Sequence, residues 1–342
     1  MAGALDASTV LRDTVADRGP SRALADGQVG RARELENMGR AAEAADQARQ
    51  ALAVARDIGY RAGEVLALGV LSFAASGAGD QDGAVQLAQQ AARITAGVPG
   101  QTVRWCSYVL TIALIKAGDL AAADEVCAAG LARSRDVGDV QTQEFLLPHM
   151  VMLDVHAGRV GDTAAHLREG LQIAVRTGGR GDLLECLECC GYLCAATGRS
   201  AEAATMWAAS AALSRHEEVT EATADARLRD APLRTVRQAL GADQTQAAEE
   251  RGAAMSLATA TEYALMLTAP GPQAPPTGLN KLSARERELV TLVAQGRTDA
   301  QIAAQLYISI RTVRSHLDRI RDKTGCRRQA DLTRLALQAG LA

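Results

Sequence analysis

Four polar residues near the carboxyl end of the sequence have types and spacing suited to contacts with a nucleic acid. Arg311, Arg314, Ser315 and Asp318 follow one another at intervals of three, one and three positions. An α-helix places residues with this spacing on one face. A planar guanidinium donates two parallel hydrogen bonds to guanine, and a helix with such a polar face fits the major groove of B-DNA. The spacing therefore predicts a helix face that reads base edges.

The residues of this face and its borders are expected to divide the work of binding double-stranded DNA. Arg314 and Ser315 are predicted to meet bases, and Asp318 either repels phosphate or accepts a hydrogen bond from a cytosine amino group. Phosphate contacts are predicted for Arg311, Thr312, Arg319 and Lys323. His316 flanks the face, where a DNA contact and a purely structural hydrogen bond are equally good interpretations.

Two helices joined by a tight turn are needed to hold this face outward. Thr298 is the predicted N-cap of the first helix, with Gln301 as its capping-box partner, and the helix is expected to end near Leu306. Residues 307–309 form the turn, and Ser309 caps the second helix. The opposite face of that second helix carries Val313, Leu317 and Ile320, which are expected in a core. The pattern indicates a helix-turn-helix, the alternative being a helical interaction domain with a charged, solvated face.

A longer pattern of apolar, turn and capping residues surrounds these two helices. Its members are Leu282, Ser283, Arg285, Glu286, Ala294, Gly296, Ile302, Ala303, Leu306, Ile308, Ser309, Thr312, Val313, Arg314, His316, Ile320, Lys323, Gly325 and Arg328. The pattern resembles the LuxR-type DNA-binding domain. The resemblance implies a four-helix module that binds DNA as a dimer, with dimer contacts from the last helix around Leu332 and Leu335. Asp299 and Gln301 stand where the family usually has Asn and Glu, a departure that bears on the target sequence.

The charges of the chain are unevenly distributed along its length. Residues 281–342 hold twelve Lys and Arg against six Asp and Glu, a balance of +6, whereas the remaining residues have a balance of −9. A positive field concentrated in one small module is the electrostatic footprint that phosphate neutralisation requires. The charge pattern therefore favours DNA binding by this module.

The preceding part of the chain repeats itself with a nearly constant period. The glycines Gly39, Gly79, Gly118, Gly158 and Gly198 follow one another at intervals of 39 or 40 residues. Small or apolar residues recur five, nine and twelve positions after each glycine, with Thr163 as the exception, which predicts stacked helix pairs in close contact. The pattern resembles the tetratricopeptide-like superhelix of large LuxR-type regulators of the MalT sort. We expect Pro148 to kink or divide one repeat helix and residues 231–233 to start a new helix after the repeats.

The amino-acid composition and the positions of the prolines complete the predicted domain organisation. The sequence has 342 residues, of which 48% are hydrophobic and only 3% aromatic, a composition typical of an all-α fold packed through small side chains. We predict a helical-repeat sensor or interaction domain at residues 1–267, a Pro/Gly-rich linker at 268–281 and the LuxR-type helix-turn-helix domain at 282–342. Four of the eight prolines lie in this linker, so it is expected to be extended.

Several other functions find little support in the sequence. No apolar run is long enough to cross a membrane, so we expect a cytoplasmic protein without membrane contact. No P-loop is present, and no nucleophile and base are suitably spaced, so we predict neither an ATPase domain nor any other enzyme, and no cofactor. Cys186, Cys189, Cys190 and Cys194 share one helix face. Buried packing is the preferred interpretation over a metal or redox site, because four thiolates on one helix cannot all reach one metal ion.

The sequence therefore predicts a DNA-binding transcription regulator, more readily an activator than a repressor, that acts as a homodimer. Its repeat groove would receive a small molecule or a protein, and an activator would also contact RNA polymerase. Trp105, Tyr108, Tyr192 and Trp207 either line that groove or fill gaps among alanines, and we prefer the second interpretation. The alternative function is a repeat scaffold with weak DNA binding, which antagonises related full-length regulators through the last helix.

Overall fold

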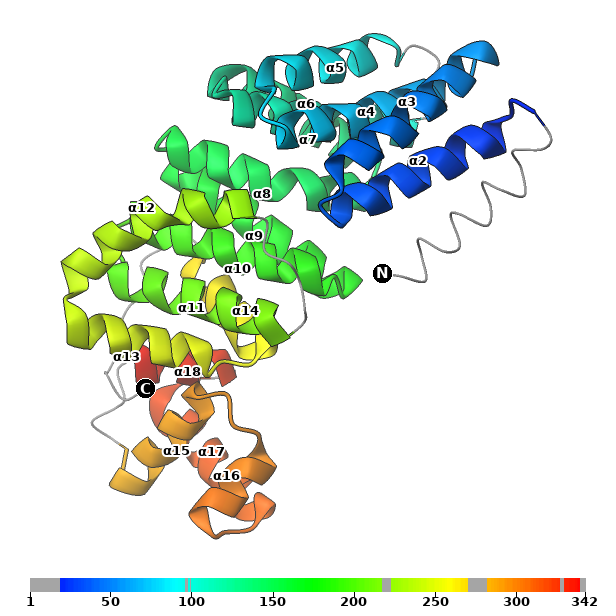
Figure 1. The fold of residues 1–342 in the computed structure, drawn as a ribbon. Helices are drawn as coiled ribbons and strands as arrows, with labels where there is room; N and C mark the ends of the chain where they lie inside the picture. Colours follow the sequence, from blue (N-terminus) through cyan, green and yellow to red (C-terminus); the bar gives the residue numbers. More distant parts are fainter. Residues whose placement is uncertain are drawn as a thin grey trace. The chain divides into compact units, whose positions relative to one another are not determined.

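The structure is a computed structural model that describes residues 19–95, 98, 100–216, 223–269, 282–326 and 329–338. Within these ranges the regular structure consists of seventeen α-helices, which confirms the predicted all-α class (Figure 1). The first seven helices are α2 (Arg22–Asn37), α3 (Ala41–Asp57), α4 (Arg61–Gly77), α5 (Gln81–Arg93), α6 (Gly100–Ala117), α7 (Leu120–Asp136) and α8 (Val140–His156). The remaining ones are α9 (Val160–Thr177), α10 (Arg180–Ala196), α11 (Ser200–His216), α12 (Thr223–Leu240), α13 (Ala242–Ala253), α14 (Leu257–Leu267), α15 (Ala284–Ala294), α16 (Asp299–Leu306), α17 (Ile310–Thr324) and α18 (Gln329–Gln338).

Contacts divide the chain into two compact units, one up to Leu153 and one from Asp154, so that the division falls within α8. The predicted division was at the linker instead. In the second unit, α14 packs against α9, α10 and α11 of the repeats and also against α18, which explains why the contacts group the last repeats with the C-terminal helices. Of the predicted linker, residues 270–281 lie outside the described part of the chain.

The helices pack as consecutive antiparallel pairs, and glycines make the turns between them. All five glycines of the predicted repeat have a positive φ, between 69° and 88°, which confirms that they end one helix and start a turn. Gly59, Gly138 and Gly178 also have a positive φ and make alternate turns, a second periodic signal that the sequence interpretation missed. Glycine suits these turns because a Cβ disfavours left-handed backbone.

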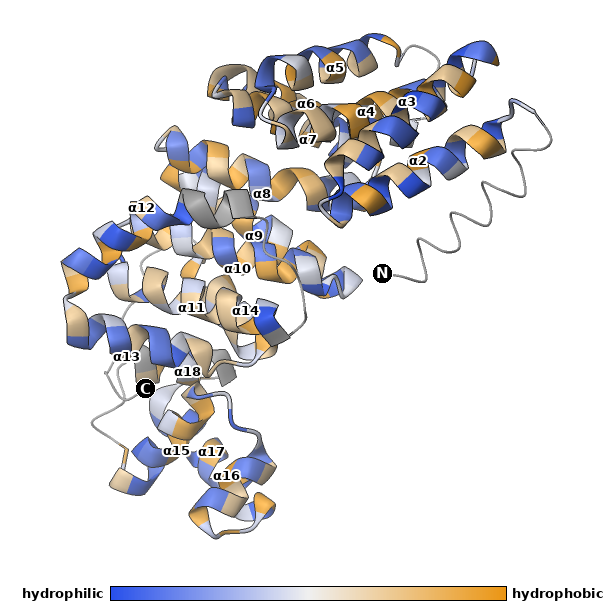
Figure 2. Ribbon diagram, in the orientation of Figure 1, coloured by the Kyte–Doolittle hydropathy of each residue, from blue (hydrophilic) through white to orange (hydrophobic). Residues whose placement is uncertain are grey.

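The recurring small and apolar residues lie at the helix contacts, as predicted. Those that follow the repeat glycines by five, nine or twelve positions are all buried: Ala44, Ala84, Ala123, Thr163, Ala203, Ala48, Ala88, Cys127, Leu167, Trp207, Ala51, Ala91, Gly130, Gly170 and Ser210. Figure 2 shows that the repeat helices carry both polar and apolar residues. The buried residues of α3, α5 and α9 recur on one side of each helix, the amphipathic pattern of elements that must stack. None of the described helices is both long and apolar enough to cross a membrane.

Two prolines lie inside helices. Pro148 lies within α8, which continues unbroken to His156, so it does not divide that helix. The predicted helix start at residues 231–233 is wrong, because α12 already begins at Thr223 and contains Pro232. A proline removes one main-chain donor, but the hydrogen bonds of the other turns hold such a helix together. Two short helices, α13 and α14, follow α12, and the side chain of Ser256 caps the second.

Gly130 marks a close approach of three helices in the first unit and provides a test of the packing. A Cβ placed on Gly130 of α7 would lie 2.9 Å from Cβ of Ser107 in α6 and 3.0 Å from Cδ1 of Leu146 in α8. We expect Gly130→Val to lower the free energy of unfolding by about 1–3 kcal/mol, because the added methyl groups overpack this contact. Urea unfolding followed by circular dichroism measures the change.

The matched control is Gly30→Val in the middle of α2, where a Cβ would meet nothing within 4 Å. This variant should stay within about 0.5 kcal/mol of the parent. Equal stability of the two valine variants would contradict the close packing of α6, α7 and α8.

Candidate nucleic-acid interface

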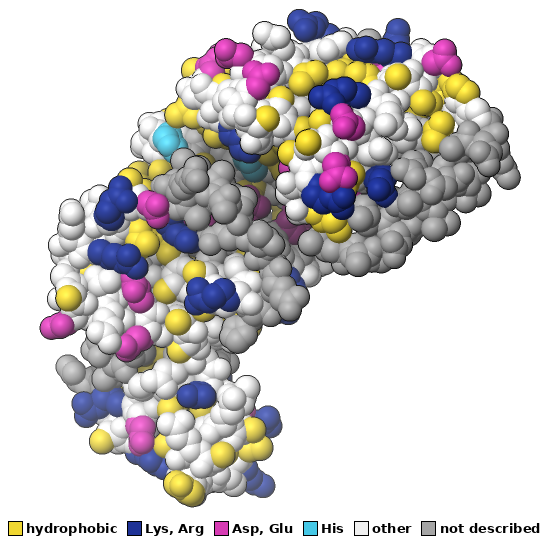
Figure 3. All heavy atoms as spheres, viewed as in Figure 1, with side chains coloured by type: hydrophobic (Ala, Val, Ile, Leu, Met, Phe, Trp, Pro, Cys, Tyr) yellow, Lys and Arg dark blue, Asp and Glu magenta, His cyan; other side chains and the backbone are white. Residues whose placement is uncertain are grey.

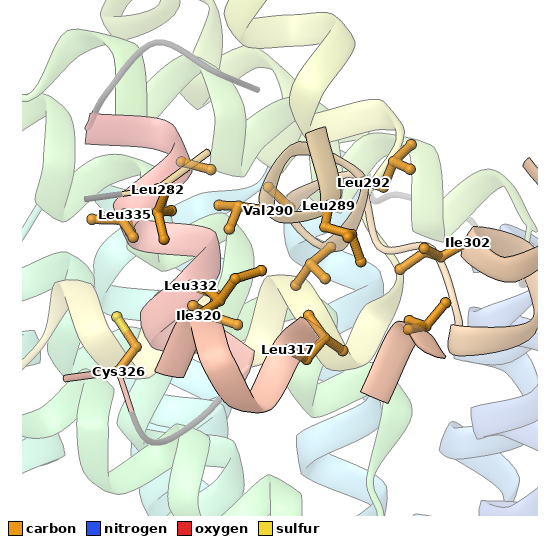
Figure 4. Close-up of a cluster of buried hydrophobic side chains, with 14 of the residues drawn as sticks. Leu282, Leu289, Val290, Leu292, Ile302, Leu317, Ile320, Cys326, Leu332 and Leu335 are labelled. Carbon is orange, nitrogen blue, oxygen red and sulfur yellow. The ribbon is translucent and has the colours of Figure 1, made fainter. Parts of the chain in front are cut away.

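Helices α15 to α18 form a module with its own apolar core, which Figure 4 shows in close-up. The core residues of α17 are Val313, Leu317 and Ile320, which are at most 6% exposed, as their spacing predicted. They meet side chains of α15, α16 and α18, including Leu289, Ile302 and Leu332. Burial of this stripe fixes the rotation of α17 about its axis and turns its opposite face to the solvent.

The predicted caps and turn of the two central helices are confirmed. Thr298 and Gln301 form a capping box at the start of α16, and the helix ends at Leu306. Tyr307 follows in the left-handed region with φ 54°, and the Ser309 side chain accepts a hydrogen bond from the Thr312 amide at the start of α17. These local contacts set the angle at which α17 leaves the turn.

The predicted reading face lies together on the outside of α17. Arg311, Arg314, Ser315 and Asp318 are all exposed, as are the flanking Arg319 and Lys323, whereas Thr312 and His316 are half-buried. On the face drawn in Figure 3, the part formed by α15 to α17 shows several Lys or Arg side chains and few acidic ones. The spacing argument therefore gave the right placement for these side chains.

Two ion pairs restrain side chains of this face. Nε of Arg314 donates to Oδ2 of Asp299 at 3.0 Å, across from α17 to the start of α16. Along α17 itself, Nη1 of Arg321 donates to Oδ1 of Asp318 at 2.9 Å. These four side chains, with Arg297, line a cavity of about 290 Å³ beside the reading face. The acidic residues of the face thus already have partners within the domain.

Lys323 has a partner in the domain rather than a fully free ammonium group. Its Nζ lies 2.7 Å from both carboxylate oxygens of Glu286, a residue that is only 4% exposed. Glu286 also accepts from the amide of Ser283, in the capping box of α15. The ammonium group of Lys323 and these amide and hydroxyl donors lower the pKa of Glu286 to about 2. Lys323 therefore ties the end of α17 to the start of α15, a role that sequence spacing did not indicate.

Leu332 and Leu335 do not lie where a dimer contact needs them. Both side chains are 0% exposed and belong to the core of the module, facing α15 and α17. The expectation that these two leucines contribute dimer contacts is corrected by this placement, because a fully buried side chain has no surface to offer a second copy. Their apolar spacing reflected the module's own core.

The remaining candidate residues pack within the helical repeats. Tyr192 and Trp207 are buried and meet edge to face at 5.3 Å, so they fill space. Trp105 and Tyr108 are half-buried and cluster with Phe73, Phe145 and His149. Burial lowers the pKa of His149 to about 4, so this residue is neutral at physiological pH.

The four cysteines of α10 are all buried. A hydrogen bond with Cys194 and burial raise the pKa of Cys190 well above the usual thiol value. Buried cysteine side chains behave as small apolar groups, in agreement with the packing interpretation. In the described ranges, no group of three His, Cys, Asp or Glu residues lies close enough together to hold a metal ion.

Three residues that position the interface were not singled out as site residues. Arg285 of α15 donates to the carbonyl oxygen of Leu306 at 2.8 Å and thus holds the last turn of α16. Arg321 follows Arg314 and Asp318 at the helical spacing i+7 and i+3, so the periodicity alone placed it beside the face. Asp299 was visible only as a departure from the family pattern. Its pairing with Arg314 joins positions fifteen residues apart, which only the fold brings together.

The fold and the exposed polar face define the C-terminal module as a helix-turn-helix DNA-binding domain. Residues 280–336 match the family described as bacterial regulatory proteins, luxR family, so this module is a LuxR-family domain and the resemblance is confirmed. The chain thus carries a DNA-binding domain of the kind found in bacterial transcription regulators.

Curated relatives match the chain over two different extents. Response regulator Rre1 of Synechocystis sp. is 44% identical over 57 residues, which are 17% of this chain and 25% of that protein. A protein of Mycobacterium tuberculosis described as an HTH-type transcriptional regulator is 27% identical over 194 residues, 56% of this chain and 20% of that protein. An alignment of that length must extend into the helical repeats. The chain therefore spans a quarter or less of the length of these relatives.

The contact between Lys323 and Glu286 gives a test by pH. We expect Lys323→Met to lower stability by about 1–3 kcal/mol at neutral pH, because a buried carboxylate loses its main partner. The pKa of Glu286 is lowered in the folded parent protein. The parent therefore keeps this contribution at neutral pH and loses it as the pH falls from about 5 towards about 2. We therefore expect the free energy of unfolding to fall less steeply between about pH 5 and about pH 2 in the variant than in the parent, as measured by urea unfolding at a series of pH values.

Arg319→Met is the matched control, since it removes an exposed cation from the same helix. It should change stability by less than about 0.5 kcal/mol and leave the pH dependence as in the parent. Identical acid unfolding of the parent and Lys323→Met would show that the pair does not stabilise the module.

Proposed function

We propose that this chain is a sequence-specific transcription regulator that binds inverted half-sites in double-stranded DNA as a homodimer. The observation that carries the proposal is the exposed face of α17, where Arg311, Arg314 and Ser315 stand on a scaffold that buries the opposite side. A LuxR-family domain on residues 280–336 supports the same function. A protein with this function would act in the cytoplasm, where bacterial DNA lies. The proposal includes no catalytic step.

The side chains of the face take different roles in this proposal. Arg314 and Ser315 meet base edges, since they lie at the centre of the exposed face and can donate hydrogen bonds. Phosphates are held by Arg311, Thr312, Arg319 and, in part, Lys323, whose ammonium group is shared with Glu286. His316 borders the face without an assigned base. Dimer contacts come from parts of the module other than the buried leucines of α18.

We further propose that the helical repeats receive a signal, a small molecule or a partner protein, and pass it to the reader through α14. Arg168 of α9 donates to the carbonyl oxygens of Leu265 and Thr268 at 2.7 and 3.2 Å, and Arg199 donates to that of Leu267 at 3.1 Å. These bonds fix the end of α14, which also packs against α18. The protein would then activate transcription, with RNA polymerase as a further partner, once the signal releases α18.

Selection of binding sites from random duplex DNA with the full chain tests the main proposal. A shared palindromic sequence would support a dimeric reader, whereas failure to enrich any sequence would contradict it and favour a repeat scaffold. On the selected operator, Arg314→Ala should cost about 1–3 kcal/mol and relax the preference at one base pair. Arg319→Ala should weaken all duplexes alike and reduce the salt dependence of binding. Equal behaviour of the two variants would refute the division of roles.

The role of α14 has a separate test. Arg168→Met removes two hydrogen bonds from the end of α14, and we expect it to raise operator affinity severalfold because α18 is held less firmly. Fluorescence anisotropy with labelled operator measures the change. Arg176→Met, an exposed position on the same helix α9, is the control and should bind as the parent does. Unchanged affinity in Arg168→Met would show that the reader works independently of α14.

A further inference from the structure

The guanidinium group of Arg314 is held by a residue of the preceding helix. Its Nε lies 3.0 Å from Oδ2 of Asp299, and the two side chains are 71% and 36% exposed. Asp299 is the first residue of α16, directly after the Thr298 cap, so the capping box with Gln301 fixes its backbone. A carboxylate at this end of a helix is also favoured by the helix dipole. The carboxylate that accepts the hydrogen bond from Arg314 is therefore attached to a firmly held part of the backbone.

The other acid near this site has a different partner. Asp318 accepts from Arg321, and both line the same cavity as Asp299 and Arg314. Arg297 contributes a further cation to that cavity. The arrangement thus couples Asp299 to Arg314 and Asp318 to Arg321, and the two arginines are held by separate acids.

The atom used in this contact decides what remains for a ligand. A guanidinium carries one N–H at Nε and two amino groups at its end, all in one plane. Because Asp299 engages Nε, the two terminal amino groups stay available, and rotation of the plane is restrained. Guanine offers O6 and N7 side by side as two acceptors in the major groove, which an arginine meets with two parallel hydrogen bonds. A restrained plane loses less side-chain freedom when these bonds form.

A carboxylate in this position also changes the affinity for DNA in a way that does not depend on the base sequence. It lies next to the surface on which DNA phosphates would rest, so it weakens the attraction for any duplex. An acid that reduces general affinity but orders an arginine favours discrimination between sequences over strength of binding.

We propose that Asp299 is a positioning residue that fixes the plane of Arg314 for one guanine of each half-site. The inference rests on the proposed function, and it goes beyond that function by assigning the base and the residue that makes its recognition selective. Asp299 itself does not contact the base.

The test is a double-mutant cycle on the full chain, read by anisotropy with the selected operator, with the operator lacking that guanine, and with an unrelated duplex. Asp299→Ala should reduce the discrimination between the first two duplexes roughly tenfold and should raise the affinity for the unrelated one. Asp299→Asn keeps an acceptor without the charge, and we expect it to keep more of the discrimination than the alanine variant does. Arg314→Lys keeps the positive charge but removes the pair of parallel N–H donors. In that background, loss of Asp299 should leave the discrimination between the first two duplexes unchanged.

Asp322→Ala is the matched control, since it removes an exposed acid of α17 from the same DNA-binding module. It should raise affinity for all duplexes without changing discrimination. The inference is overturned if Asp299→Ala behaves in the same way, because Asp299 would then act by charge alone. Thermal melting checks the fold of each variant, and Asp299→Ser, whose side chain is too short to reach Arg314, replaces the alanine variant if needed. Absence of any sequence preference in the parent would instead refute the proposed function.

Discussion

The orientation of one helix is the constraint on which the C-terminal module depends. Val313, Leu317 and Ile320 must be buried, and the core that receives them has room for only one rotation of α17. Burying three such side chains contributes several kcal/mol, about 1.5–3 for each, far more than any single polar contact on the outer face. The outer face is therefore presented as a consequence of the core. Its polar residues are free to vary with the target, since they contribute little to holding the helix in place.

Polar contacts then refine what the core has oriented. Lys323 and Ser283 satisfy the buried carboxylate of Glu286, and Arg285 holds the last carbonyl group of α16, so the ends of three helices are tied together. Such contacts matter because a buried carboxylate without partners destabilises the folded state. On the exposed side, the acids pair with arginines instead. The module therefore uses ion pairs in two ways. Below the surface an ion pair attaches helices to one another, and on the surface ion pairs restrain the side chains of the reading face.

The helical repeats follow a different physical rule. Their helices approach closely because small residues recur at fixed positions, and Gly130 lies so near to α6 and α8 that a Cβ would be crowded there. No single repeat buries its apolar face, so stability comes from stacking of neighbours. The last member of this stack, α14, differs in that it packs on repeat helices and on α18 as well. Among the described helices, α14 is thus one that contacts both the repeats and the DNA-binding module.

The sequence by itself determined those features that depend on local spacing. The glycine period gave the turns of the repeats, the capping box gave the start of α16, and the i, i+3, i+4, i+7 pattern gave the exposed face of α17. Local spacing suffices there because helix geometry alone decides which residues share a face. Only the tertiary structure decided that Leu332 and Leu335 belong to the module's own core, and that Asp299 holds Arg314 and Glu286 holds Lys323. These contacts join positions far apart in the chain, and an apolar or charged residue in a sequence does not reveal which surface it will meet.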